Sequence, residues 1–484
     1  MQRMKRRNII LVLIACFSAL QGIAQDSTTR VPNETFTLQQ CVDIAVKNNN
    51  TVKLSLFTME NDKVAVQGAL GNILPYVSGS VAHNEYYGRS INPNTNQFVN
   101  TQNLAATYSF GASITLWNAS ALRKYLEQTN DYYKAGTMDV QQNKDLITIT
   151  IILDYLQVLS DLEQLNITLS SLAATREQVR VNDAKNESGA IAPSDYFLLK
   201  GQLGTNEVAA SSAKGALEAA KVQLCQDMNV NYSSTMTLAP IGDTNILAPY
   251  GSNVDEIYGY SLHNLALVKA ADYRLEGARA QVKSARGQLF PSLSLNAGVG
   301  TNYSSYNQTN NFVDSVLTNT GQFINPGAAQ NPVYYYKYNY SGQNIQYFNQ
   351  LKGDVNYYVG LQLNIPILES FQYRNRLRQA KIQRDQYDFT RTTTHIQLRQ
   401  AIEKDYVNMS IGFDNYKSTV REVDAYNQAF KAAQAQLDAG SINTYTYVIA
   451  KNNIDGANLS LVAAKYNYIL QTKILDYYLG RLTY

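Results

Sequence analysis

The most regular hydrophobic pattern in this sequence is an alternation of apolar and polar residues. It is clearest over residues 355–367, where mainly Val, Tyr, Leu and Ile occupy one register and mainly Asn, Gly and Gln the other. A period of two is typical of β-strands, because successive side chains of a strand point to opposite faces. The pattern recurs three more times and predicts strands at about 75–87, 104–117, 291–304 and 355–368.

A second pattern, with apolar residues every three or four positions, marks two very long stretches at about 120–187 and 371–438. No proline lies between residues 94 and 192 or after residue 366, and an interior proline would cost a helix about 3 kcal/mol. Both stretches are therefore predicted helices, each about 100 Å long at ~1.5 Å per residue. A second helix returns from each of them, at about 194–228 and 444–479. Helices of this length imply coiled-coil packing between neighbours.

The same order of elements occurs twice, which indicates an internal repeat. The segment VQGALGNILP at residues 66–75 recurs as VKSARGQLFP at residues 282–291, an offset of 216. Residues 188–200 recur as residues 439–451, an offset of 251. A repeat of this length means that each half is one structural unit and that neither half closes a core alone.

The repeat divides the chain into a first half at residues 25–228, a linker at residues 229–253 and a second half at residues 254–484. The change of offset from 216 to 251 indicates about 35 extra residues in the second half. They fit into the Tyr-, Asn- and Gly-rich segment 306–354, which is predicted to be a long loop between two strands.

The predicted strands carry apolar residues on one face and small polar residues on the other. This is the lipid-out, water-in pattern of a transmembrane β-barrel, although a half-buried sheet of a soluble protein alternates too. The soluble interpretation leaves no element to cover the apolar faces, because the helices pack on one another. Four strands leave two unpaired edges, whereas three copies supply twelve strands. The expected fold class is therefore a mixed α and β membrane protein, a homotrimer with a twelve-stranded barrel.

The first 24 residues resemble an export signal. Four basic residues precede an apolar run at residues 9–20, and a small-residue site follows at Gly22–Ala24, so Gln25 would begin the mature chain. A rival interpretation makes Cys16 a lipidation site. Removing the signal lowers the formal charge from +3 to −1 (3 − 4), which leaves no basic excess for binding nucleic acid.

The chain shows no pattern that predicts an enzyme, a metal site or a cofactor. Three histidines are scattered, two cysteines of the mature chain lack framework spacing, and no phosphate-binding loop of the G-x-x-x-x-G-K-[ST] type occurs. Ser261 stands two residues before His263 but lacks the glycines of a nucleophile elbow. If the function of the chain requires energy, that energy must therefore come from partners.

Taken in order, these features resemble the TolC-like outer-membrane efflux proteins over nearly the whole mature chain. Residues 36–49 resemble the opening helix of that family. The family's junctions between helices and strands are matched by Leu74–Pro75, Phe290–Pro291 and residues 365–368. Its two hairpin tips are matched by Gly189 with Asp195, and by Gly440. Each match is weak alone, but their order, repeated twice, is specific.

The resemblance implies a homotrimer in the outer membrane whose barrel continues into a long α-helical barrel in the periplasm. Residues 229–253 would contribute an equatorial belt. The implied function is the exit duct of a tripartite efflux or type I secretion system that exports small molecules or polypeptides. The implied partners are a periplasmic membrane-fusion adaptor, a proton- or ATP-driven inner-membrane pump and outer-membrane lipid, with no nucleic acid. The alternative is a non-transporting outer-membrane structural or adhesive trimer.

The resemblance also implies two kinds of site at the hairpin tips. Candidate adaptor contacts are Gly189, Ala190, Ile191, Gly440, Ser441 and Ile442. Candidate residues of a periplasmic gate are Asp195, Thr446, Ile449, Tyr445 and Tyr447.

The gate departs from the family pattern in its second half. The family places acids near the tips and a basic residue on the second hairpin. Asp195 matches one acid, whereas Thr446 and Ile449 stand at the other acidic positions and Ile442 at the basic one. The closed state would then depend on helix packing and on the two tyrosines. Asp195 also fits a simpler role as an early-turn acid favoured by the helix dipole.

Overall fold

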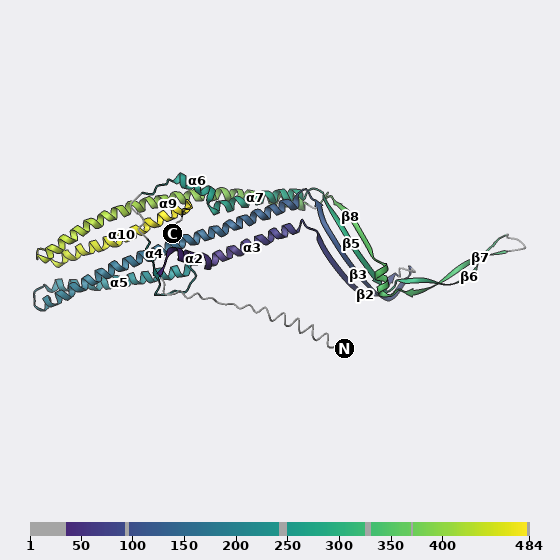
Figure 1. The fold of residues 1–484 in the computed structure, drawn as a ribbon, viewed down its shortest axis with the longest axis horizontal. Coiled ribbons are helices and arrows are strands. Elements are labelled where there is room, and N and C mark those ends of the chain that lie inside the picture. The colour runs from purple at the N-terminus through teal and green to yellow at the C-terminus, as the bar shows by residue number, and fades with distance from the viewer. Residues whose placement is uncertain (1–34, 92–95, 242–248, 325–330, 369–370, 482–484) are drawn as a thin grey trace, which may run out of the picture. The chain divides into compact units, whose positions relative to one another are not determined.

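The computed structural model describes residues 35–91, 96–241, 249–324, 331–368 and 371–481, and its elements are labelled in Figure 1. The predicted signal at residues 1–24, including Cys16, lies outside the described residues. The chain divides into two compact units, one of residues 1–60, 135–272 and 390–484 and the other of residues 61–134 and 273–389. No helix among the described residues is both long and apolar enough to cross a membrane.

The long helices come in two matching sets. The first half contains α2 (Leu38–Asn48), α3 (Asn50–Gly71), α4 (Ala121–Glu187) and α5 (Pro193–Asp227). The second half contains α6 (Val254–Asn264), α7 (Ala266–Gly287), α9 (Gln372–Asp438) and α10 (Thr444–Tyr478). The corresponding helices have identical lengths of 11, 22, 67 and 35 residues. The helices α6 and α7 begin 216 residues after α2 and α3, and α9 and α10 begin 251 residues after α4 and α5.

The first helix of each set begins with the same N-terminal capping box. Thr37 caps α2 by accepting a bond from the backbone N–H of Gln40, whose side chain accepts one from the backbone N–H of Thr37. Asn253 and Glu256 form the same capping box at the start of α6. Reciprocal capping satisfies backbone donors that would otherwise have no partner in the first turn.

The β-structure is centred on one antiparallel sheet in the order β2-β3-β5-β8. Its strands are β2 (Tyr76–Ile91), β3 (Phe98–Trp117), β5 (Ser292–Ser304) and β8 (Asn356–Asn364). The strands β2 and β3 pair beyond the predicted ends, whereas β8 stops before Pro366, which cannot donate to a ladder.

The register of this sheet aligns the apolar positions of its four strands. One row of partners is Val77, Ala112, Ala297 and Val359, and another is Gly79, Phe110, Val299 and Tyr357. The next row is Ser80, Ser109, Gly300 and Asn356. Partners on adjacent strands share a face, so one face is largely apolar and the other is largely small and polar. The apolar side chains are open to solvent in the single chain, as the 77% exposure of Val359 shows.

The prediction that residues 306–354 form a loop is wrong. This segment contains β6 (Gln308–Ile324) and β7 (Asn331–Asn344), which pair as an antiparallel ribbon, followed by the short helix α8 (Tyr347–Gly353). The prediction gave weight to the Tyr, Asn and Gly composition and missed the alternation of tyrosines along β7. The amide of Gln350 on α8 is buried and bonds the backbone of Ser304, the last residue of β5, in both directions at 3.0 Å.

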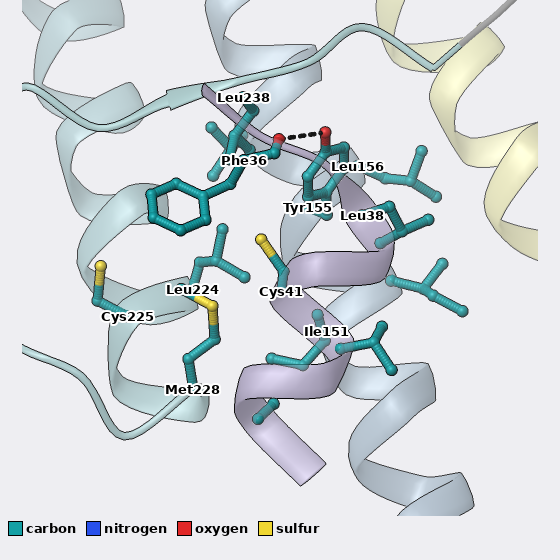
Figure 2. Packing of buried hydrophobic residues seen from close by; sticks show 14 of the residues in the cluster. Phe36, Leu38, Cys41, Ile151, Tyr155, Leu156, Leu224, Cys225, Met228 and Leu238 are labelled. Carbon is teal, nitrogen blue, oxygen red and sulfur yellow. Dashed lines mark hydrogen bonds between the residues drawn. The ribbon is translucent and has the colours of Figure 1, made fainter. Parts of the chain in front are cut away.

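The core of the first unit forms where α2 meets α4 and α5. Figure 2 shows Cys41 of α2, Ile151 of α4 and Leu224 of α5 together in this cluster, and each has 0% exposure. The two-residue strand β1 (Thr35–Phe36) pairs in parallel with β4 (Thr237–Leu238) beside it. This pairing ties the start of the described chain to the segment 229–253, which was expected to form a belt.

Candidate functional site

The two helical hairpins turn with the same backbone geometry. Gly189 follows α4 with φ +72°, and the N–H of Ala190 bonds the carbonyl of Lys185 at 2.7 Å. Gly440 follows α9 with φ +70°, and the N–H of Ser441 bonds the carbonyl of Gln436 at 2.9 Å. A left-handed residue with a bond from the following residue back across the last turn is a Schellman stop. Glycine favours it because it has no Cβ to clash at positive φ.

The returning helices begin differently at the two tips. The helix α5 starts with Pro193 in its first turn and has no side-chain cap, and Asp195 lies half-buried in the same turn. The helix α10 is capped by Asn443, whose side chain accepts bonds from the N–H and the hydroxyl of Thr446 at 3.0 and 2.8 Å. The hydroxyl of Thr446 is therefore used in the cap, whereas an acid at the corresponding place in α5 interacts with the helix dipole.

The predicted adaptor contacts are mostly accessible. Gly189, Ala190, Gly440 and Ser441 are exposed, and Ile191 is half-buried. Ile442 is also half-buried and packs against a small apolar cluster just inside the tips. The structure thus brings the predicted residues of each tip together on one turn.

The predicted gate residues divide into exposed and buried ones. Tyr445 and Ile449 are 58% and 41% exposed, and Thr446 is also exposed. Tyr447 is only 4% exposed, because its ring packs with Val179 of α4 and Leu199 of α5. Its hydroxyl accepts a bond from the amide of Gln178 on α4. Tyr447 therefore joins the second hairpin to the first, whereas the exposed Tyr445 does not.

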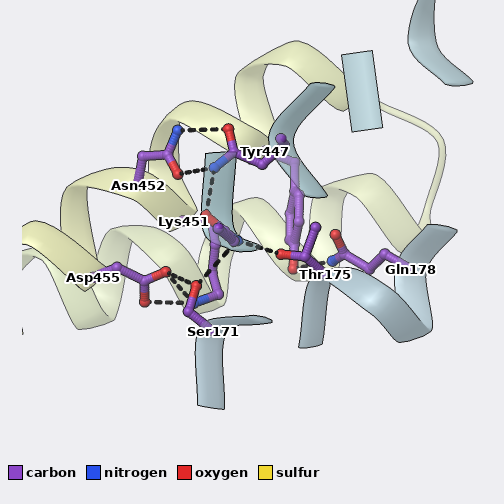
Figure 3. A network of polar contacts seen from close by, with 9 residues as sticks. Ser171, Thr175, Gln178, Tyr447, Lys451, Asn452 and Asp455 are labelled. Atoms are coloured by element: carbon purple, nitrogen blue, oxygen red, sulfur yellow. Dashed lines mark hydrogen bonds and ion pairs between the residues drawn. The ribbon is translucent and has the colours of Figure 1, made fainter. Parts of the chain in front are cut away.

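A charged network that sequence reasoning missed lies beside Tyr447 (Figure 3). Lys451 and Asp455 form an ion pair on α10, with side-chain exposures of 18% and 21%. The hydroxyl of Ser171 on α4 donates to Asp455 at 2.6 Å. The pair is thereby both shielded from water and attached to the neighbouring hairpin, so that it acts as a link between helices.

Neutral side chains extend this link to α5. Asn452 of α10 and Gln202 of α5 exchange two amide hydrogen bonds, at 3.1 and 3.2 Å. Gln202 also donates to Asn206 at 3.0 Å, and Asn206 donates to Thr175 of α4 at 2.8 Å. We call these residues together with Ser171, Gln178, Tyr447, Lys451 and Asp455 the hairpin network.

One sequence signal could have located the network. Lys451 stands 251 residues after Lys200, so the two are equivalent in the repeat, and yet only Lys451 has an acid four residues further on. Lys200 is exposed and lies over the ring of Tyr196 at 4.6 Å. Within the described residues, no group of three or more His, Cys, Asp or Glu side chains is arranged to hold a metal ion.

Comparison with known proteins agrees with this architecture. The sequence model of a family described as "Outer membrane efflux protein" matches residues 258–481. The outer membrane protein TolC of Escherichia coli (strain K12) is 25% identical over 360 residues, which cover 72% of this chain and 64% of that protein. TolC of Salmonella enteritidis is 23% identical over the same lengths. The aligned region thus spans a little under two thirds of each relative.

Solved structures share the fold along nearly the whole chain. The Campylobacter jejuni CmeC outer membrane channel has a TM-score of 0.72 and 18% identity, covering 95% of this chain and 91% of that one. The open state of the Neisseria gonorrhoeae MtrE outer membrane channel has a TM-score of 0.70 and 14% identity, covering 92% and 91%. At these identities the likeness concerns the fold alone.

The chain therefore has the mixed α and β fold of these outer membrane channels. The second half of the chain matches the outer membrane efflux protein family, and the chain resembles TolC-like proteins located in the outer membrane and extending into the periplasm. That family comprises channels and not enzymes.

Proposed function

We propose that this chain is the outer-membrane exit duct of a tripartite efflux or type I secretion system. The observation that carries the proposal is the register of the four-stranded sheet, which gathers apolar side chains on one face and leaves β2 and β8 as unpaired edges. Apolar residues on the outer face and small polar residues on the inner face are suited to lipid outside and water inside. Open strand edges would be unsatisfied in a bilayer, so the sheet requires further strands.

Three copies of the chain supply those strands. Edge β2 of one copy would pair with β8 of the next, giving a closed twelve-stranded barrel from three sheets of four strands. The equal helix lengths and constant offsets support an internal repeat whose halves contribute equivalent helices to an α-helical periplasmic barrel. The segment 229–253, tied to β1 by β4, would belong to the equatorial belt.

The hairpin tips would contact a periplasmic membrane-fusion adaptor. Gly189, Ala190 and Ile191 form one tip and Gly440, Ser441 and Ile442 the other, and their exposed backbone turns leave room for a partner to approach. A Cβ added at Gly189 or Gly440 would meet no atom within 4 Å in the single chain. A proton- or ATP-driven inner-membrane pump would supply the energy and the substrate, small molecules or polypeptides.

The hairpin network would hold the gate closed. Opening requires the second hairpin, α9 and α10, to move away from α4 and α5, and the network joins these elements through Tyr447, Asn452 and Asp455. With Ile442 in place of a basic residue at the tip, Lys451, nine residues further along the chain, brings the positive charge into the network. The exposed Tyr445, Thr446 and Ile449 and the half-buried Asp195 would face the passage or the partner.

The assembly and the tip contact can be tested together. Native mass measurement in detergent is expected to give three chains. Replacing Gly189 and Gly440 with Lys is expected to abolish export by intact cells while three chains still assemble, because a bulky cation would obstruct the partner and a Cβ at positive φ would strain the turn. The exposed Lys200→Gln, outside the tip turns, serves as a control with normal export. A stable monomer would overturn the architecture, and normal export by both glycine variants would overturn the tip contact.

A second candidate function is a non-transporting structural or adhesive trimer in the outer membrane. The exposed aromatic ribbon of β6 and β7 favours it, because such a surface suits a binding partner. The two functions differ in one measurement: deleting the chain should raise the intracellular level of an exported solute only if the chain is a duct.

A further inference from the structure

The ribbon formed by β6 and β7 has two chemically different faces. Directly paired residues share a face, and the pairs on one face are Phe312 with Tyr340, Ser315 with Tyr338, Leu317 with Tyr336, and Asn319 with Tyr334. We call the large side chains of this face, Phe312, Leu317, Tyr334, Tyr336, Tyr338 and Tyr340, the tyrosine face. The ring of Phe312 lies 6.1 and 6.2 Å from those of Tyr338 and Tyr340, so the row is continuous.

The opposite face of the ribbon is mixed, because it carries Val316 and Tyr335 together with the charged residues of the ribbon. It pairs Asp314 with Asn339, whose amide donates to the carboxylate at 2.8 Å, and Val316 with Lys337. Asp314 and Lys337 are the charged residues within the bounds of β6 and β7. The ribbon strands therefore carry no net charge, and the tyrosine face carries none at all.

The tyrosine face is as large as the largest apolar patches on soluble monomers. Its six side chains are between 49% and 60% exposed. A large aromatic side chain has about 200 Å² to bury, so at half exposure the five aromatic side chains offer roughly 500 Å², and Leu317 adds to this area. The largest patches on soluble monomers reach about 300–600 Å², and one side of a standard protein interface measures about 800 Å². The face thus has nearly the area of one half of an interface.

Lipid does not suit this surface. Among the described residues, β6 and β7 form a sheet of only two strands, with backbone donors and acceptors along both outer edges. Such edges are not tolerated in the hydrocarbon of a bilayer, and a lone two-stranded ribbon is marginally stable in water. The ribbon needs a partner that covers aromatic rings and leaves the edges and phenol hydroxyls hydrated.

We propose that this partner is a second copy of the chain, so that the tyrosine faces of the three copies in one trimer meet around its threefold axis. The inference rests on the proposed trimer, and it adds a joint between copies that is separate from the strand edges of the sheet. Copies of the ribbon can approach closely, because strands without net charge do not repel one another. Chains already held in one assembly also need less area to associate, since their effective concentration is high.

Cysteine crosslinking in the full chain tests the contact, with the two faces of one strand as matched controls. Tyr336→Cys and Tyr338→Cys place a thiol on the tyrosine face, and Tyr335→Cys places one on the opposite face. The native Cys41 and Cys225 are buried and remain in every variant. On oxidation of outer membranes, the tyrosine-face variants are expected to give covalent dimers in at least tenfold higher yield than Tyr335→Cys.

A second measurement does not depend on thiol geometry. The double variant Tyr336→Ser with Tyr338→Ser should lower the temperature at which the trimer dissociates in detergent, whereas Tyr335→Ser should leave it unchanged. Equal crosslinking from both faces, or none, in a preparation whose native mass is three chains would overturn the ribbon contact and leave the trimer intact. A native mass of one chain would instead overturn the proposed function on which the contact rests.

Discussion

The hydroxyl of Ser171 joins α4 to the ion pair of α10, so Ser171→Ala tests whether the hairpin network holds the gate closed. The substitution removes the 2.6 Å bond to Asp455 and two weaker bonds of 3.5 Å that the hydroxyl accepts from Lys451 and Asn206. Both charged groups of the Lys451–Asp455 pair remain. Helix α4 should tolerate the change, because alanine has the highest helix propensity. The effect expected is therefore on the joint between the hairpins and not on the fold of either one.

The size of the effect follows from the chemistry of the bond. A hydrogen bond to a charged group contributes about 1.5–3 kcal/mol. The Asp455 side chain is still 21% exposed, so the lower value applies, about 1.5 kcal/mol for each copy, or roughly a tenfold shift toward opening. If three copies open together, the shifts combine to about 4.5 kcal/mol, on the order of a thousandfold.

Single-channel recording in planar bilayers measures this shift as the fraction of time spent in the open state. Ser171→Ala should be open far more often than wild type, and the thermal stability of the assembled protein should change little. Ser170→Ala is the matched control, because it removes the hydroxyl of an exposed neighbour on the same helix. That control should behave as wild type.

Two results would contradict the role of Ser171. The first is an open fraction that matches Ser170→Ala while three chains remain assembled. The second is an equally large effect of Ser171→Ala when Asp455 has already been replaced by Ala, because the hydroxyl would then act through some other group.

Two further predictions concern carboxylates on the first hairpin. Asp195→Asn should reduce cation selectivity and block by multivalent cations in the same recordings, since Thr446 and Ile449 add no acid; unchanged selectivity would leave Asp195 as a helix-start acid. Burial, and after it the neighbouring carboxyl group of Asp227, raises the pKa of Asp154 to about 7. Because the folded state favours the protonated Asp154, this group stabilises the fold fully below about pH 4, and the stabilisation is lost as pH rises through about 7. Melting temperatures between pH 5 and 8.5 should therefore fall for wild type and fall less for Asp154→Asn.

The sequence alone determined the elements whose causes are local. Alternation predicts the strands of the sheet, and the long stretches without proline predict α4 and α9, because a period and a helix breaker act within a few residues. Gly189 and Gly440 mark the ends of those helices for the same reason, since a left-handed stop depends on one residue. The offsets of 216 and 251 likewise follow from the chain itself.

The ribbon of β6 and β7 shows where a local pattern was present but ambiguous. Tyrosines alternate along β7, yet Asn and Gly are frequent in turns as well as in this segment. Only the pairing with β6 decides between a loop and a strand, because a strand is stabilised by a partner that its own sequence does not specify.

The hairpin network depends on tertiary structure, because its residues come from three different helices. Lys451 and Asp455 stand four residues apart, a spacing shared by any solvated pair on a helix. Their importance comes from Ser171, 284 residues away in the chain, and from the neighbours that leave each side chain about one-fifth exposed. Tyr447 is buried for the same reason, whereas Tyr445 two residues before it is exposed. Helical periodicity places side chains around one helix, but the packing of that helix against others determines which of them meet water and which meet a partner.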